Sequence, residues 1–220
     1  MSRPRLGLLG GTFDPVHIGH LALARTARAA LHLDALRLIP TGASWQKSGV
    51  VASPAQRLAM LQLALAGEPG LIADPREIER AGPSYTIDTL AELRAEVGPD
   101  TSLVLILGSD QLRNLATWRR WQELTDYAHI ACTQREQVPL SDLPAEVEAL
   151  VSRVGCETLP DAPAGSIVLF SMPPVPVSAT ALRAAFRRGE RPAELVPPAV
   201  LDYIERQNLY GTGSAGSVND

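Results

Sequence analysis

The chain has 220 residues, of which 45% are hydrophobic, so it is long enough to bury a sizeable core as one domain. A net charge of −4 and a pI near 5.6 provide no basic field for a nucleic-acid backbone. No window approaches the run of about 18 apolar residues that a membrane span needs, and the N-terminal apolar run is too short for a signal peptide. Cys132 and Cys156 lack the spacing of a metal or redox motif. We therefore expect a soluble, cytoplasmic protein with free thiols and no nucleic-acid or membrane partner.

Apolar runs of strand length alternate with segments of helical periodicity along the chain. In the first half, the pattern predicts a strand at 5–9, a helix at 18–31, a strand at 35–40, a helix at 54–66, an interrupted strand segment at 71–80 and a helix at 85–97. In the second half, it predicts a strand at 102–108, short helices across 109–125, a strand at 129–133, a helix at 144–154, a strand at 166–170 and helices at 178–188 and 197–208.

This order of strands and helices predicts an α/β fold, a doubly wound parallel sheet with a small C-terminal helical part. The run at 102–108 is apolar on both faces, which is typical of a central strand covered by helices on both sides. Ser53 followed by Pro54 is a strong helix start. We expect one domain over 1–210 and a disordered tail over 211–220, because the tail has almost no apolar content.

The segment GLLGGTFDPVHIGH follows the first predicted strand, where a doubly wound sheet places its ligand site. Gly10 and Gly11 let backbone amides approach a phosphate, and the helix that begins near residue 18 offers its positive end. His17 and His20 are three residues apart, so both imidazoles lie on one face of the first helical turn. A bound phosphate would raise their pKa and favour the protonated form. These residues predict a phosphate site.

Two other interpretations of this segment remain open. A dinucleotide-binding oxidoreductase would carry G-x-G-x-x-G, whereas this chain has G-x-x-G-G-T. A transition-metal site would need a third and a fourth ligand beside the two histidines, and His32 and His129 supply no matching pattern. We therefore predict no metal ligands in the chain.

Two short motifs resemble signatures of a nucleotidyltransferase superfamily. The first is (H/T)-x-G-H, present here as His17-Ile18-Gly19-His20, and the second is S-x-T-x-x-R, present as Ser178-Ala179-Thr180-Ala181-Leu182-Arg183. Within the superfamily the chain is most similar to the bacterial nicotinate mononucleotide adenylyltransferases, over roughly residues 5–210. Further stretches carry this resemblance at 37–47, 82–90, 105–112, 117–121 and 203–210.

The resemblance implies an enzyme of NAD biosynthesis that joins nicotinate mononucleotide to ATP, giving nicotinate adenine dinucleotide and pyrophosphate. It implies direct in-line attack of the mononucleotide phosphate on the α-phosphorus of ATP, without a covalent enzyme intermediate. It also implies Mg²⁺ with ATP, because an unshielded triphosphate disfavours an incoming anion. The expected partners are these small molecules, and the oligomeric state stays open.

The resemblance also assigns roles to individual residues. Catalysis would rest on His17, His20, Lys47 and Arg183. ATP would further contact Gly10, Gly11, Thr12, Phe13, Gly108, Asp110, Ser178 and Thr180. Nicotinate mononucleotide would contact Tyr85, Thr86 and Trp118, with the tryptophan ring stacked on the pyridinium.

Some of these assignments have ordinary structural alternatives. Asp110 could simply cap a helix, and Trp118 and Trp121 could be core residues. Gln46 stands where many relatives carry a histidine, which puts the participation of that loop in doubt and leaves Lys47, the only lysine, as its cation. Another nucleotidyltransferase activity, or a nucleotide sensor without turnover, also remains possible. The presence of both motifs favours catalysis.

Overall fold

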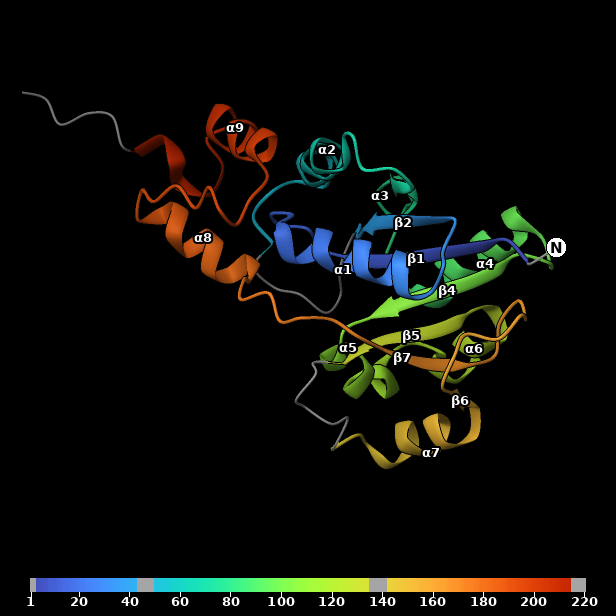
Figure 1. Ribbon diagram of the computed structural model, residues 1–220. Helices are drawn as coiled ribbons and strands as arrows, with labels where there is room; N and C mark the ends of the chain where they lie inside the picture. The colour runs from blue at the N-terminus through green and yellow to red at the C-terminus, as the bar shows by residue number, and fades with distance from the viewer. Residues whose placement is uncertain (1–2, 43–49, 135–141, 215–220) are drawn as a thin grey trace, which may run out of the picture.

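The computed structural model describes residues 3–42, 50–134 and 142–214, and in these residues seven parallel strands form one sheet (Figure 1). The strand order is β3-β2-β1-β4-β5-β7-β6, which confirms the predicted doubly wound sheet. The strands are β1 (Arg5–Gly11), β2 (Ala35–Pro40), β3 (Leu71–Ala73), β4 (Ser102–Leu107), β5 (His129–Gln134), β6 (Gly155–Cys156) and β7 (Ile167–Ser171).

Helices follow most of the strands, and all but α3 lie close to the positions that apolar periodicity predicts. They are α1 (Ile18–Ala30), α2 (Pro54–Leu65), α3 (Arg76–Glu79), α4 (Thr86–Val97), α5 (Ser109–Arg113), α6 (Leu124–Tyr127), α7 (Ala145–Val154), α8 (Ala179–Arg187) and α9 (Pro198–Arg206). The described residues also form the short 3₁₀ helices η1 (Leu115–Thr117), η2 (Trp121–Glu123) and η3 (Leu209–Ser214), the last of which is kinked at Tyr210 and Gly211. None of the helices in the described part of the chain is long and apolar enough to cross a membrane.

Strand β4 is the centre of the sheet, between β1 and β5, and all six of its residues are buried. Its side chains alternate between two apolar clusters, as period-two geometry requires. Leu103 and Leu105 pack in the cluster that also holds buried residues of α4, α5, α6 and α7. Val104 and Ile106 pack in the cluster of α1, α2, α8 and α9. The prediction of a central strand covered on both faces is confirmed.

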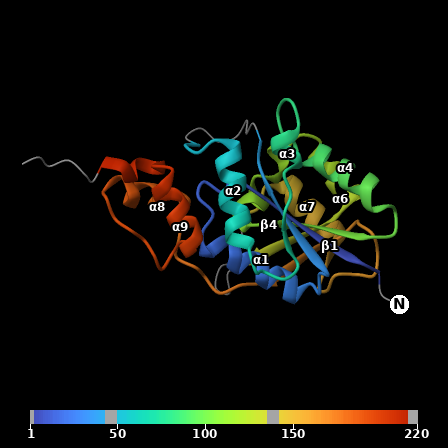
Figure 2. The same ribbon diagram turned by 90° about the horizontal axis from the view of Figure 1, so that it is seen from above.

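The direction of strand connection reverses between β1 and β4. From β1 the chain continues to β2 and β3 on one side, and from β4 it continues to β5 on the other. The carboxyl ends of these two strands therefore border the crevice in which doubly wound sheets bind their ligands. Helices α8 and α9 lie at this end of the molecule, beside α2 and far from the N-terminus (Figures 1 and 2).

The segment 71–80 differs from the sequence prediction of an interrupted strand. The strand β3 ends at Ala73, and residues Arg76–Glu79 form the helical turn α3. The carboxylate of Asp74 accepts a hydrogen bond from the backbone N–H of Arg76 at 3.1 Å, and this side-chain contact starts the turn. The prediction of strand was wrong there because a local hydrogen bond outweighs the apolar pattern.

Two further differences lie near the ends of the sheet and of the chain. The two-residue edge strand β6 was not predicted, since its glycine and cysteine carry no strand pattern. The predicted boundary between domain and tail at residue 210 falls inside η3, whose backbone continues to Ser214. Residues 215–220 lie outside the described residues.

Candidate active site

Two clefts open at the carboxyl edge of the sheet, and they bring together most of the predicted site residues. The one we call the histidine cleft is lined by His17, Gly19, His20, Leu23, Gly108, Ser109, Asp110, Thr133, Met172, Pro173, Pro174, Val175 and Val177. The other, the tryptophan cleft, is lined by Leu8, Gly10, Gly11, Thr12, Ile39, Thr41, Glu77, Ser84, Tyr85, Thr86, Thr89, Leu90, Leu105, Leu107, Gln111, Trp118 and Arg119. The clefts border one another at the end of β4, where Leu107 lines one and Gly108 the other.

The two histidines lie side by side at the start of α1. Their rings stack with centroids 3.7 Å apart, and the backbone N–H of His17 donates to Nδ1 of His20 at 3.3 Å. The buried Phe13 ring packs edge-to-face with the His20 ring, with the ring centroids 4.9 Å apart. The shared face that the spacing predicted is present, and Phe13 supports it with its ring.

Glycine is required at two positions around these rings. A Cβ at Gly19 would lie 2.8 Å from Cγ1 of Val177, so its absence lets the segment before α8 approach the start of α1. A Cβ at Gly11 would lie 2.9 Å from the Phe13 ring. Both glycines therefore allow a close approach that any side chain would block.

Burial sets the charge of His17 in the unliganded protein. The side chain is 7% exposed, and desolvation lowers its pKa from 6.5 to about 4. The ring is neutral at pH 7, and a bound phosphate would have to reverse this effect to protonate it. In either state an imidazole can donate one N–H to an oxygen.

The buried His17 predicts a pH dependence of stability. The unfolded chain, with an ordinary pKa near 6.5, binds more protons than the folded chain between pH 4 and 6.5. The free energy of unfolding therefore does not depend on His17 titration above pH 6.5. It decreases as pH falls from 6.5 to 4, by up to about 3 kcal/mol in total. A His17→Gln variant should show a shallower fall in urea midpoint between pH 6.5 and 4.5. The exposed His32, changed to Asn, should keep the wild-type slope, and equal slopes in all three proteins would contradict the effect.

The end of β4 contributes Gly108 and Asp110 to the histidine cleft. Gly108 precedes α5 as its capping residue, and its backbone N–H donates to the Gln111 side chain at 3.1 Å. Asp110 is the second residue of α5 and is exposed at the cleft. The alternative that Asp110 caps this helix is wrong, because Gly108 holds that position.

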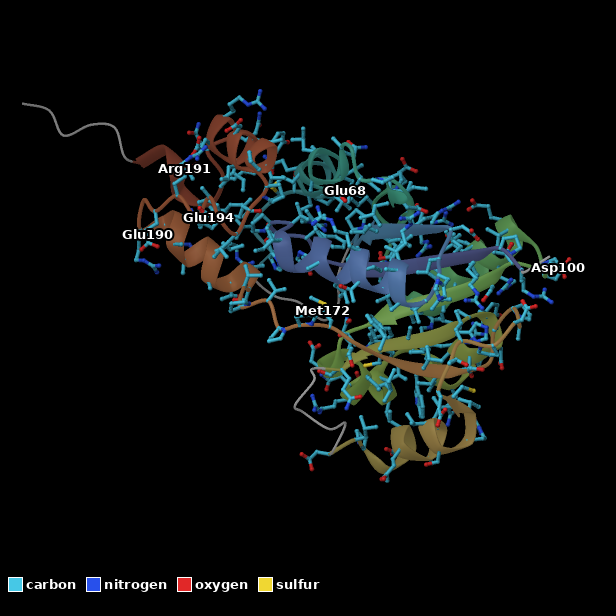
Figure 3. All side chains as sticks on the ribbon, in the orientation of Figure 1. Glu68, Asp100, Met172, Glu190, Arg191 and Glu194 are labelled. Atoms are coloured by element: carbon cyan, nitrogen blue, oxygen red, sulfur yellow. The ribbon has the colours of Figure 1, made fainter. Side chains whose placement is uncertain are left out.

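The second motif begins α8, next to the rim of the histidine cleft. Figure 3 labels Met172 on the connection from β7 to α8, and this connection lines the cleft as far as Val177. Ser178 caps α8 as predicted, accepting from the backbone N–H of Ala181 at 3.2 Å. The exposed Thr180 accepts from Nη2 of Arg183 at 3.3 Å.

Arg183 reaches back to the loop after β1. Its Nη1 donates to the backbone oxygen of Asp14 at 2.7 Å, and its side chain is 16% exposed. The described lining of the two clefts does not include Ser178, Thr180 or Arg183. The structure thus places this motif beside the first one, one residue beyond the cleft wall at Val177.

Two buried charged residues that the sequence analysis missed hold the loop after β1. Asp14 accepts from the backbone N–H groups of Val51 and Ala52, at 2.8 and 3.1 Å. The guanidinium of Arg57 donates to the backbone oxygens of Thr12 and Thr41, at 2.8 and 2.6 Å. Asp14 lies in the segment GLLGGTFDPVHIGH, three residues before the first motif, so its position was a signal. Arg57 lies in an ordinary helical pattern, which carries no sign of this role.

The tryptophan cleft gathers the predicted mononucleotide residues. Tyr85 precedes α4 and Thr86 begins it, while the partly buried Trp118 follows η1. The guanidinium of Arg119 lies over the Tyr85 ring, 4.7 Å from its centroid. Trp118 and Trp121 both pack, partly buried, against the apolar cluster of α4 to α7. Trp118 also lines the cleft, whereas Trp121 is absent from the described lining, which favours its interpretation as a core residue.

Sequence reasoning also missed the two charged residues of the tryptophan cleft, Arg119 and Glu77. Glu77 is buried, which raises the pKa of its carboxyl, and the hydroxyl of Thr89 donates to it at 2.8 Å. Lys47, with Trp45 and Gln46, lies outside the described residues. No group of three or more His, Cys, Asp and Glu in the described part of the chain could hold a metal ion.

Comparison with known proteins decides the family. The model of the cytidylyltransferase-like family matches residues 8–185. A protein of Aeromonas hydrophila, described as a probable nicotinate-nucleotide adenylyltransferase, is 46% identical over 213 residues, which cover 96% of this chain and 99% of that protein. The chain belongs to the nicotinate-nucleotide adenylyltransferase family. A relative from Herminiimonas arsenicoxydans with the same description is 45% identical, covering 93% of this chain and 96% of its own.

Membership of this family confirms the resemblance that the two motifs predicted and makes the chain a nucleotidyltransferase. Solved structures agree in fold. The nicotinic acid mononucleotide adenylyltransferase of Plasmodium falciparum, solved with NaAD, superposes with a TM-score of 0.69 at 16% identity and covers 94% of this chain and 97% of its own. A second structure of the Plasmodium enzyme, solved with APC, gives a TM-score of 0.68 at 16% identity.

Proposed function

We propose that this chain transfers the AMP part of ATP to nicotinate mononucleotide, giving nicotinate adenine dinucleotide and pyrophosphate. The observation that carries the proposal is the pair of clefts that border one another where β1 and β4 end. Two nucleotides bound in neighbouring clefts would meet at this border, and holding two reactants in line supplies a large part of the rate of such a transfer. The relatives described above bear the name of this activity.

ATP would occupy the histidine cleft. Its adenosine would lie against Gly108 and Asp110, and its triphosphate would pass His17 and His20 toward the start of α8. There the free N–H groups of the first helical turn and the Arg183 guanidinium attract anions. We assign the β- and γ-phosphates to Ser178, Thr180 and Arg183, and assign Lys47 to the same phosphates on the family resemblance alone.

Nicotinate mononucleotide would occupy the tryptophan cleft. An electron-poor pyridinium favours stacking on a large electron-rich ring, and Trp118 offers one at the cleft wall. The nicotinate carboxylate needs donors, which the backbone amides of Tyr85 and Thr86 at the start of α4 supply. Gly10, Gly11, Thr12 and Phe13 would present backbone to the phosphates near the border of the two clefts.

The reaction we propose is a direct displacement. An oxygen of the mononucleotide 5′-phosphate forms a bond to the α-phosphorus as the bond from that phosphorus to the bridging oxygen of pyrophosphate breaks. A phosphate monoester is already a nucleophile at neutral pH, so the protein needs no general base. Its contribution is positioning and stabilisation of charge, with the His17 and His20 imidazoles donating N–H to the α-phosphate oxygens.

The divalent cation would enter as part of the ATP complex. In the described residues, no group of three or more acidic, histidine or cysteine side chains could hold a metal ion. Mg²⁺ binds mainly phosphate oxygens and water, with few protein ligands. The triphosphate of ATP would therefore supply most of its ligands in the histidine cleft. Bound there, it would offset the negative charge of the triphosphate.

The substrate assignment predicts a preference for the acid over the amide mononucleotide. A nicotinamide would present its NH₂ to amide donors at Tyr85 and Thr86, and unpaired polar groups of this kind cost about 1–3 kcal/mol. Pyrophosphate release from ATP should therefore show kcat/KM at least about tenfold higher with nicotinate mononucleotide. Equal or better use of nicotinamide mononucleotide would remove the assignment, and full activity with CTP would remove ATP as the donor.

A further inference from the structure

Asp14 joins four segments of the chain that are far apart in sequence. Its side chain is almost fully buried and accepts two backbone hydrogen bonds from Val51 and Ala52. The hydroxyl of Tyr210, from the end of the chain, donates to the same carboxylate at 2.6 Å. Nη1 of Arg183 lies 3.9 Å from the other carboxylate oxygen and donates to the backbone oxygen of Asp14. The carboxylate thus connects the loop after β1, the segment before α2, helix α8 and η3.

Tyr210 is held in a single orientation. The residue is 4% exposed, and its ring stacks on Phe186 of α8 with centroids 5.7 Å apart. Burial, and then the negative Asp14, raise the pKa of the Tyr210 hydroxyl, so it stays protonated and donates. The backbone of Tyr210 is left-handed, with φ of 59°, a conformation that is unfavourable for a non-glycine residue.

Core packing alone does not account for a tyrosine at this position. A phenylalanine would fill the same space beside Phe186 without burying a hydroxyl that needs a partner. The partner it has is a carboxylate three residues before His17, in the loop that leads into the first motif. The sequence stretch 203–210, which resembles the family but has no part in either cleft, ends on this residue.

We propose that Tyr210 is a positioning residue for Arg183. Its hydroxyl fixes the Asp14 carboxylate, and Asp14 in turn orients the Arg183 guanidinium through its backbone oxygen and its charge. Tyr210, near the C-terminus, thereby orients the Arg183 guanidinium in α8. This inference rests on the proposed function, because the phosphates of ATP are what Arg183 would bind.

A Tyr210→Phe variant tests the inference, because it removes only the hydroxyl. We expect the Kd of an ATP analogue with a methylene between its α- and β-phosphates, and the KM for ATP, to rise about tenfold. An Arg183 guanidinium that is no longer oriented would lose a charge-assisted hydrogen bond to phosphate, and such a bond is worth about that much. The KM for nicotinate mononucleotide should stay within about twofold, since none of the residues that contact the Asp14 side chain lines the tryptophan cleft. Tyr203→Phe, in α9 against the same core, is the matched control and should change neither constant.

The route through Arg183 is tested by repeating the change in an Arg183→Ala background. If Tyr210 acts through that guanidinium, losing the hydroxyl there should change analogue binding by less than about twofold. The same tenfold loss in both backgrounds, equal losses for both substrates, or unchanged ATP affinity in Tyr210→Phe would each overturn the inference. The shape-preserving Asp14→Asn variant should reproduce the selective loss for ATP, and a selective loss for the mononucleotide would contradict it.

The two levels of the proposal fail in different ways. Turnover of the wild-type enzyme with nicotinate mononucleotide tests the proposed function. Binding of the ATP analogue, measured by calorimetry, tests the role of Tyr210. This measurement does not depend on which phosphate acceptor the enzyme uses. Thermal unfolding of each variant gives the folded fraction by which the binding constants are corrected.

Discussion

A His20→Ala variant should lower the turnover number by about 100-fold or more at saturating substrates. The imidazole would donate to an oxygen of the α-phosphate, where charge builds during displacement, and alanine offers no donor. The fold should change little, because His20 is only partly buried and lies at the cleft, where its ring contacts include Phe13 and His17. Steady-state pyrophosphate release, with circular dichroism of the same samples, measures both effects.

The control for this prediction is His32→Asn. His32 lies after the end of α1, is exposed, and has a left-handed backbone that asparagine tolerates. Its turnover should equal that of the wild type. Wild-type turnover in His20→Ala would exclude the role we assign to this imidazole, and a loss of equal size in His32→Asn would show that the effect is not specific to the cleft.

The largest loss of stability is expected for Arg57→Met. The Arg57 side chain is 2% exposed and donates to the backbone oxygens of Thr12 and Thr41, which join the loops after β1 and β2. Methionine fills much of the volume but leaves both oxygens without these donors, at about 1–3 kcal/mol each. We expect the free energy of unfolding to fall by about 3 kcal/mol or more, measured by urea denaturation, and activity to fall because Thr12 lines the tryptophan cleft.

An exposed arginine provides the comparison. Arg25 pairs with Glu68 on the surface, and its side chain is 57% exposed. Surface ion pairs contribute about 0–1 kcal/mol to stability. Arg25→Met should therefore lower the free energy of unfolding by about 1 kcal/mol at most and leave turnover unchanged. Equal losses in the two variants would mean that the buried guanidinium does not hold the loops as we describe.

Local sequence patterns predicted most of the helices and strands, because the interactions that form these elements lie within a few residues of one another. The apolar run of β4, the serine cap before α2 and the periodicity of α1 each contain their own explanation within a few residues. The prediction failed at 76–79, where one hydrogen bond from Asp74 to the next turn decides between strand and helix. Strand β6 pairs with β7 through backbone hydrogen bonds, and the residue types of its two positions do not predict this pairing.

The sequence predicted the site residues that belong to recognisable motifs and missed those that act through distant contacts. His17 and His20 are neighbours in sequence, so their shared face follows from helical spacing. The contact of Asp14 with Tyr210 spans 196 positions, and Arg57 meets Thr12 across 45, so neither has a local signature. Contacts of this kind depend on how whole elements pack, which a single sequence does not express.

The central claim is that two nucleotides meet across the border of the two clefts. A crystal structure of the enzyme with nicotinate adenine dinucleotide tests it most directly. We predict adenosine beside Gly108 and Asp110, the bridging phosphates within hydrogen-bond distance of His17 and His20, and the pyridine ring on Trp118. A dinucleotide whose pyridine ring lies outside the tryptophan cleft, or whose phosphates do not contact the two imidazoles, would contradict the account.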